Sequence, residues 1–180
     1  VDTGGSHSDL TDEYAAVRKE MESVAEYLGK SVLREVDEDE FMKNIADIRS
    51  SCGDRAVLRA MHFYGDNARV EKQAAALKAG DFETFKKYII ESGRSSYMYN
   101  QNVYSCKKAS EQPVSLALSL SEKLLDGCGA WRVHGGGFAG TIQAFVPLNK
   151  LDEYKDLMEK VFGSGSCYIL SVRPVGGVEL

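Results

Sequence analysis

VHGGGFAGTIQAFV, residues 133–146, sets a glycine-rich turn between two short runs of strand-forming residues. The turn holds four glycines within six residues, with Phe138 between them as an anchor: Gly135, Gly136, Gly137 and Gly140. Glycine can adopt positive φ and lets another group approach the backbone without a Cβ in the way. Successive backbone N–H groups in such a turn can form a concave anion site, so the turn favours a phosphate-bearing ligand. The alternative is a tight connection whose glycines serve only turn geometry.

The segments around this turn are predicted to be strands and helices. Pro113 stands at the favoured first position of an apolar helix that ends at Gly127. Apolar residues at helical spacing predict a last helix over residues 151–161. Strands are expected at residues 130–134 and 141–146 on the two sides of the turn, at residues 1–3, and at the alternating residues 167–172 before Pro174.

Four more amphipathic helices are predicted before the turn, each with a start or stop signal. They run from Thr11 or Asp9 to Gly29, from a capping box of Asp37 and Glu40 through Ile48, from Asp54 to Lys78 with Gly80 as the stop, and from an Asp81 cap to Gly93. Residues 94–112 break the periodicity and suit either an ordered loop at a binding surface or a loop packed on the domain.

The order of these elements predicts an α+β fold. Strand, helix, strand, strand, helix, strand is the order of a ferredoxin-like split βαβ sheet, and the helices of residues 37–93 form an added helical layer. Residues 1–180 then make a single domain with this helical insertion. The glycine turn joins strand to strand and lacks the lysine of a Walker A loop, so it is neither that loop nor a Rossmann turn.

Composition narrows the classes of partner. The net charge is −5 and no basic run occurs, so neither nucleic acid nor a membrane surface is expected as a partner. Four cysteines are widely spaced without a CxxC pair, which fits a reduced, cytoplasmic setting. A metal site of Cys128 or Cys167 with His134 is disfavoured, because these scattered residues do not form the closed ligand set that zinc uses.

Several single residues allow both a functional and a structural interpretation. Tyr14 begins the first helix, where its hydroxyl could face a ligand, although a buried ring with a solvated hydroxyl is the simpler interpretation. His62 lies on an apolar helix face, so burial explains it better than catalysis. The acidic run at residues 37–40 is explained by the helix dipole rather than by metal or acid–base chemistry. No serine lies in a nucleophile elbow, which argues against an esterase triad.

Two motifs carry a resemblance to a known family, and the end of the chain also suits it. GGGFAGT at residues 135–141 is similar to a glycine-rich signature near the active-site cleft of GHMP kinases, with Ala139 where a second glycine is usual. DLTDEYAAVR at residues 9–18 looks like the start of the galactokinase helix whose tyrosine contacts the sugar, and that tyrosine matches Tyr14. The ending CYILSVRPVGGVEL suits the closing strand and tail of the family. Nearly the whole chain resembles the C-terminal portion of galactokinases, which belong to the GHMP family.

The resemblance implies a role for the chain within a larger kinase. It implies the GHMP kinase C-terminal fold, and an intact enzyme that uses ATP and Mg²⁺ to convert galactose to galactose 1-phosphate. Tyr14, Gly136 and Gly137 would bind substrate, while the loop of Gly135, Phe138 and Gly140 would lie near the nucleotide phosphates. The family's catalytic residues lie in an N-terminal catalytic and nucleotide domain, so no catalytic residue and no metal ligand are expected in this chain.

The start of the chain also suits a fragment of a larger kinase. It opens on Val1 without a methionine, as expected for a fragment, and we expect the fragment alone to be inactive. A half-cleft separated from its other half can leave apolar surface exposed and favour self-association.

Three other functions stay open from the sequence alone. Another GHMP kinase, acting on a different sugar or small alcohol, would keep the glycine turn but not the Tyr14 segment. A non-catalytic galactokinase relative would bind sugar and nucleotide as a sensor and regulate a partner. A plain ferredoxin-like interaction domain would bind neither ligand, and its glycine turn would be structural.

Overall fold

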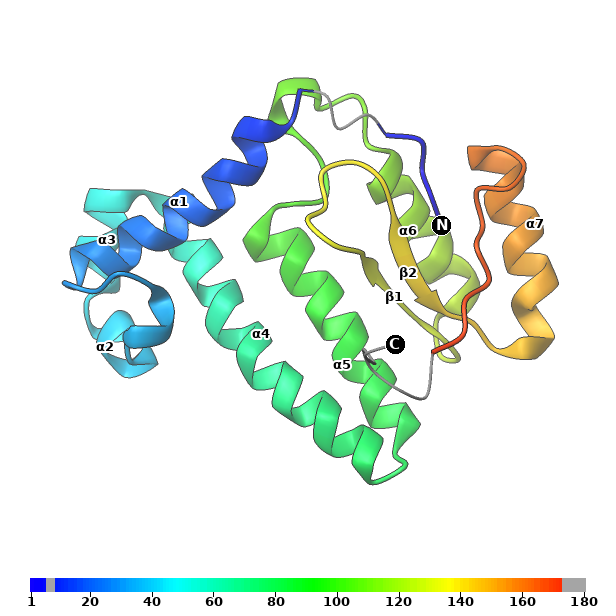
Figure 1. Ribbon diagram of the computed structural model, residues 1–180, viewed down its shortest axis with the longest axis horizontal. Coiled ribbons are helices and arrows are strands. Elements are labelled where there is room, and N and C mark those ends of the chain that lie inside the picture. Colours follow the sequence, from blue (N-terminus) through cyan, green and yellow to red (C-terminus); the bar gives the residue numbers. More distant parts are fainter. Residues whose placement is uncertain (6–8, 173–180) are drawn as a thin grey trace, which may run out of the picture.

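The computed structural model describes residues 1–5 and 9–172 and combines helices with a small antiparallel sheet (Figure 1). The α+β class predicted from the sequence is therefore confirmed. The elements are α1 (Thr11–Tyr27), α2 (Glu38–Lys43), α3 (Ile45–Cys52), α4 (Asp54–Lys78), α5 (Phe82–Ser95), α6 (Pro113–Leu125), β1 (Ala130–Val133), β2 (Ile142–Phe145) and α7 (Leu151–Phe162).

The two largest buried cores of the described residues lie on opposite sides of the long helices. The first core lies between α1, α2, α3 and α4 and includes Phe41 and Ile48, both fully buried. The second lies between the β1–β2 hairpin, α6 and α7 and includes Trp131, Leu125 and Met158. α5 contacts both α4 and β1, so it joins the helical part to the hairpin (Figure 1).

Most of the predicted helix signals are confirmed. The Asp81 carboxylate accepts from the amide of Thr84 at the start of α5, and Asp37 accepts from the amides of residues 39 and 40 at the start of α2. Gly29 has a φ of 73° and donates to the Glu26 carbonyl just after α1, as a C-terminal stop requires. The predicted cap of α1 is wrong, because Leu10 holds that position and no side-chain hydrogen bond caps the helix.

Two helix boundaries differ from the prediction. The helix after Asp37 breaks at Asn44, whose side-chain amide donates to the Glu40 carbonyl at 2.8 Å and competes with the backbone pattern. Gly93 does not stop α5: a Cβ there would lie 3.0 Å from the carbonyl oxygen of Trp131, so this glycine allows α5 to pack directly on β1.

Residues 94–112 are more regular than the sequence indicated. α5 runs on into a π-helix, Ser96–Asn100, and a 3₁₀ turn follows at Cys106–Lys108. A π-helix turns its side chains with a period different from 3.6 residues, so the apolar pattern of an α-helix is lost although the backbone stays helical. The predicted aperiodic loop is therefore wrong for its first part.

The sheet is smaller than the four strands predicted from the sequence. β1 and β2 pair antiparallel, with Ala130 opposite Phe145 and Val133 opposite Ile142. The first residues also pair with this hairpin, since Asp2 forms a bridge with Thr141. The strand at residues 1–3 is thus reduced to a single bridge beside β2.

The final strand predicted at residues 167–172 is wrong, because these residues form neither a helix nor a strand. The carbonyl of Ser166, just before them, accepts from the amide of Asp2, and the exposed fraction then rises to 87% at Leu170 and 92% at Val172. Strand propensity depends on packing against neighbours, and after Cys167, which packs against the second core, the side chains of residues 168–172 are exposed. The rest of the closing segment, residues 173–180, lies outside the described residues.

Candidate functional site

Residues 134–141 connect β1 to β2 and form what we call the glycine loop. Its backbone has positive φ at Gly135 (66°), Gly137 (80°) and Gly140 (97°). Phe138 also has a φ of 60°, a rare conformation for a bulky side chain. Gly135 and Gly136 are exposed, whereas Gly137, Phe138 and Gly140 are buried. One side of the loop is therefore fixed against the protein while the first two glycines face solvent.

Asn102 holds the buried side of the glycine loop. Its carbonyl accepts from the amide of Phe138 at 2.5 Å, and its side-chain Nδ2 donates to the carbonyl of Gly136 at 3.1 Å. A Cβ at Gly137 would overlap the carbonyl oxygen of Asn102. The loop thus lies directly on the backbone of residue 102, and only glycine at position 137 permits this approach.

Tyr14, in the first turn of α1, contacts the same loop. Its hydroxyl donates to the carbonyl of Gly137 at 2.7 Å, and its ring meets the Phe138 ring edge-on at a centroid distance of 5.2 Å. A Cβ at Gly136 would lie 2.7 Å from Cε1 of Tyr14, so this glycine is required by the tyrosine ring rather than by its own φ. Burial raises the pKa of Tyr14 above its ordinary value.

The first residues of the chain close the third side of the loop. The amide and hydroxyl of Thr3, at 2.8 and 2.6 Å, both donate to the carbonyl of Gly140. A Cβ at Gly5 would lie 2.9 Å from the Cβ of Ala139, the position where a second glycine is usual. The structure thus brings together all six residues singled out in the sequence, Tyr14 and five residues of the loop.

The backbone amides and carbonyls of the glycine loop differ in whether they have hydrogen-bond partners. Tyr14, Thr3 and Asn102 donate to loop carbonyls, and the amide of Phe138 is paired as well. Within residues 1–5 and 9–172, in contrast, the amides of Gly135 and Gly136 donate to no backbone or side-chain acceptor, whereas the amide of Gly137 closes a turn over these two residues. Two successive unpaired N–H groups, both from exposed residues, are the elements of a backbone anion site.

An ionic cluster behind Tyr14 was not found from the sequence. Arg55 and Arg59 of α4 both contact the Glu20 carboxylate of α1, at 2.5 and 2.9 Å. Burial lowers the pKa of Arg59, and the neighbouring Glu20 opposes that shift. Earlier in α1, the buried Glu13 accepts from the Ser105 hydroxyl at 2.8 Å. These contacts join α1 to α4 and to residues 100–105, and the distances along the chain explain why no local pattern indicates them.

His62 is a buried core residue, as the sequence predicted. Its Nδ1 lies 2.9 Å from the Ser95 hydroxyl and its Nε2 lies 3.7 Å from the carboxylate of Asp66. Burial lowers the pKa of His62, although the Asp66 charge acts in the opposite direction. The side chain links α4 to α5 and has no contact with the glycine loop among the interactions described.

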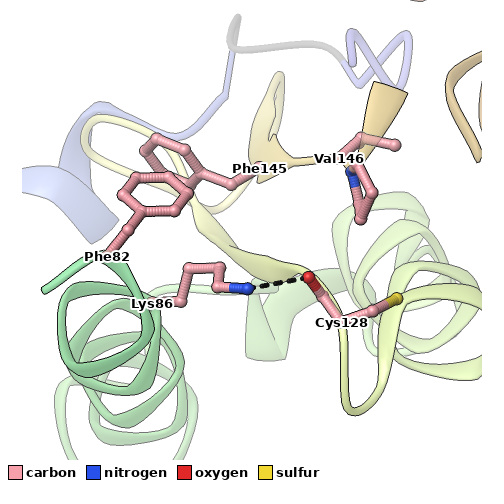
Figure 2. Close-up of a pocket in the computed structure, with 6 residues that line it drawn as sticks. Phe82, Lys86, Cys128, Phe145 and Val146 are labelled. Carbon is pink, nitrogen blue, oxygen red and sulfur yellow. Dashed lines mark hydrogen bonds between the residues drawn. The ribbon is translucent and has the colours of Figure 1, made fainter. Parts of the chain in front are cut away.

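A cavity of about 340 Å³ lies away from the loop, between the start of α5 and the end of β2 (Figure 2). Lys86 donates to the carbonyl of Cys128 at 2.9 Å, and its ammonium lies 5.7 Å from the centre of the Phe82 ring. The remaining walls are Phe145, Val146 and Pro147. The cavity shares no residue with the glycine loop, so it is not part of the site predicted from the sequence.

Other kinds of site have little support in the described part of the chain. No group of three or more His, Cys, Asp or Glu side chains is close enough there to hold a metal ion. All four cysteines are free thiols. None of the helices described could cross a bilayer, given their length and polarity.

Sequence comparison gives relatives over nearly the entire chain. No protein-family model matches. Human galactokinase is 32% identical over 174 residues, which is 97% of this chain and 41% of the relative. The bovine galactokinase is 31% identical over 91% of the chain, and that of Haemophilus influenzae strain Rd is 27% identical over 88%.

All three of these relatives belong to one class of enzyme, the sugar kinases. The chain is a homologue of the galactokinases, so the resemblance to that family found in the sequence is confirmed. The chain spans only about two fifths of the length of these relatives, 39–41%.

Proposed function

We propose that this chain is the C-terminal portion of a galactokinase. The intact enzyme would transfer the γ-phosphoryl group of ATP to the anomeric hydroxyl of galactose, giving galactose 1-phosphate. One observation carries the proposal: the glycine loop is fixed against Tyr14, while the amides of the exposed Gly135 and Gly136 stay unpaired among the described residues. A kinase needs positioned donors of this kind, because phosphoryl transfer depends on orientation and on neutralising negative charge.

We infer distinct roles for the two groups of site residues. Tyr14, Gly136 and Gly137 would bind the sugar, since Gly136 is exposed and Tyr14 contacts both of these glycines. Gly135, Phe138 and Gly140 would shape the part of the loop near the nucleotide phosphates, with Phe138 as its buried anchor. ATP, Mg²⁺ and the catalytic groups would be held by an N-terminal domain, so the 180-residue chain alone is proposed to be inactive and, with its half-cleft open, able to self-associate.

The arrangement of the paired segments supports the proposed GHMP fold. The amide of Asp2 donates to Ser166, Asp2 forms a bridge with Thr141, and β2 pairs with β1. From edge to edge the segments therefore follow the order residue 166, residues 1–3, β2, β1. This is the spatial order of a ferredoxin-like split βαβ sheet in which only the β1–β2 hairpin, at one edge, is fully formed. A cytoplasmic location, with no nucleic-acid or membrane partner, fits this proposal and the net charge of −5.

The test is an ATP-dependent phosphorylation assay on the full-length protein that carries this chain, run beside the 180-residue chain. Galactose is compared with glucose and homoserine as phosphate acceptors. Activity on galactose in the full-length protein alone is the expected result. Preference for another acceptor would support a different GHMP kinase. Galactose binding without turnover would support a sensor, and binding of neither ligand would support a plain interaction domain.

A further inference from the structure

We propose that Asn102 is a positioning residue, which Arg59 holds in place and which fixes the glycine loop against Tyr14. The inference rests on the proposed function, because the loop and Tyr14 are the groups that would meet the substrate. Asn102 contributes two hydrogen bonds to the loop, one from its backbone carbonyl and one from its side chain. It is only 5% exposed, so it acts on the loop from inside the protein and does not itself reach a ligand.

The backbone before Asn102 is held in an uncommon conformation. The π-helix Ser96–Asn100 ends at Gln101, which has a left-handed backbone with φ of 53° and ψ of 46°. The amide of Gln101 donates to the carbonyl of Ser96 at 2.8 Å and closes the last π-turn. This change of direction brings Asn102 under the glycine loop. π-turns are rare and frequently occur at functional sites, which agrees with a specific role for this one.

Arg59 fixes the end of the π-helix. Its side chain has no exposed surface, and its Nε donates to the carbonyl of Asn100 at 3.0 Å. Its Nη1 donates to the Glu20 carboxylate at 2.9 Å, and Glu20 lies on α1, the helix that carries Tyr14. One buried guanidinium thus holds both the Asn102 segment and the Tyr14 helix.

These contacts form a closed circuit around the site. It runs from Tyr14 to Gly137 of the loop, through the loop to Asn102 and Asn100, then to Arg59, to Glu20, and along α1 back to Tyr14. Each link is a hydrogen bond or a covalent segment of helix or turn. The circuit sets the relative positions of Tyr14 and the exposed loop glycines, and Asn102 is its link to the loop.

The test compares Asn102→Leu, which removes the side-chain amide at nearly constant volume, with Asn67→Leu as a matched control. Asn67 bonds only to the exposed Arg34 at 3.4 Å in the described contacts, and it lies far along α4 from the loop. Hydrogen exchange of a peptide covering residues 133–141 is measured by mass spectrometry in the full-length protein. Exchange there is expected to rise about tenfold in Asn102→Leu and to stay unchanged in Asn67→Leu, because a lost buried hydrogen bond loosens its segment by roughly that factor.

The kinetic parameters for galactose and ATP are measured on the same variants. The expected result is a loss of roughly tenfold to a hundredfold in kcat/KM that falls mainly on kcat, because a misaligned loop still binds substrate but orients it poorly. Arg59→Lys, which keeps the charge but not the two-sided contact, should change both readouts in the same direction.

Three outcomes decide the inference. Equal loop exchange in Asn102→Leu and Asn67→Leu overturns it, whatever the activity. Faster exchange throughout α5 and α6 together with the loop also overturns it, because it would mean a general loss of stability. Faster exchange confined to the loop in Asn102→Leu supports the positioning role. If the full-length wild-type protein at the same time neither binds nor phosphorylates galactose, the positioning role stands and the proposed function is wrong.

Discussion

The two ends of the β1–β2 hairpin are built in different ways. At the loop end, Thr3, Tyr14 and Asn102 all donate to loop carbonyls, and glycines are needed because neighbouring atoms lie where a Cβ would be. At the other end, Phe82 and Phe145 meet edge-on beside an open cavity (Figure 2). Hydrogen bonds and backbone contact specify one conformation, whereas apolar packing tolerates changes of similar volume. The loop end is thus the more precisely defined, as a site that orients ligands requires.

Gly137→Ala should give the largest effect on stability. The new Cβ would overlap the Asn102 carbonyl and would also force a left-handed backbone on alanine, so the free energy of unfolding should fall by about 3 kcal/mol. The control is Gly135→Ala, which has a similar φ of 66° but no atom within 4 Å of the added Cβ, and should lose only about 1 kcal/mol. Urea denaturation measures both. Equal losses would mean that the contact with Asn102 does not constrain the loop.

Gly93→Ala tests the packing in the middle of the hairpin. Alanine normally stabilises a helix relative to glycine by about 1 kcal/mol. At Gly93 the added Cβ would lie 3.0 Å from both the Trp131 carbonyl and the Arg132 Cβ, so we expect a net loss of about 1–2 kcal/mol. Gly65→Ala is the control, because its Cβ would meet only the flexible end of Arg69, and it should be neutral or stabilising. Stabilisation by both variants in thermal unfolding would show that α5 does not need this close approach to β1.

Tyr14→Phe separates the hydroxyl from the ring. The variant keeps the ring against Phe138 but leaves the Gly137 carbonyl with the amide of Ala139 alone as a donor, so the free energy of unfolding should fall by about 1 kcal/mol. Tyr64→Phe is the control, because its hydroxyl donates to the carbonyl of Val36 at 3.2 Å in the other core. In the full-length protein, Tyr14→Phe should also raise the KM for galactose, whereas Tyr64→Phe should not. An unchanged KM in both variants would remove the sugar-binding role of Tyr14.

The sequence predicted the parts of this molecule that depend on local signals. Pro113 and Asp54 mark helix starts, and Gly29 and Gly80 mark helix ends, because caps and breakers act over a few residues. The glycine loop and its two strands were found for the same reason. The contacts that shape the loop could not be predicted, since Asn102 lies 34 residues before Gly136, and nothing in its neighbourhood indicates which backbone it will meet.

The errors have a common physical origin. The local window predicts that Gly93 ends the helix, because glycine is a helix breaker, but its role is a close approach to β1. Residues 167–172 alternate as a strand should, yet a strand forms only where a partner provides hydrogen bonds and apolar contact. In both cases tertiary packing outweighed the local preference.

The smallest effect is expected at the cavity end of the hairpin. Phe82→Leu should lower the free energy of unfolding by less than about 1 kcal/mol, because Phe82 is 48% exposed and loses only part of its stacking with Phe85. Phe138→Leu is the same substitution at the loop end, where the ring is 4% exposed and packs against Tyr14, and we expect a loss of about 2 kcal/mol. Chemical denaturation gives both values, and galactose kinetics on the full-length protein should change only for Phe138→Leu. If Phe82→Leu lowered the free energy of unfolding and the activity on galactose as much as Phe138→Leu does, the two ends of the hairpin would be equally constrained. The constraint on the glycine loop would then give no reason to prefer it as the ligand site.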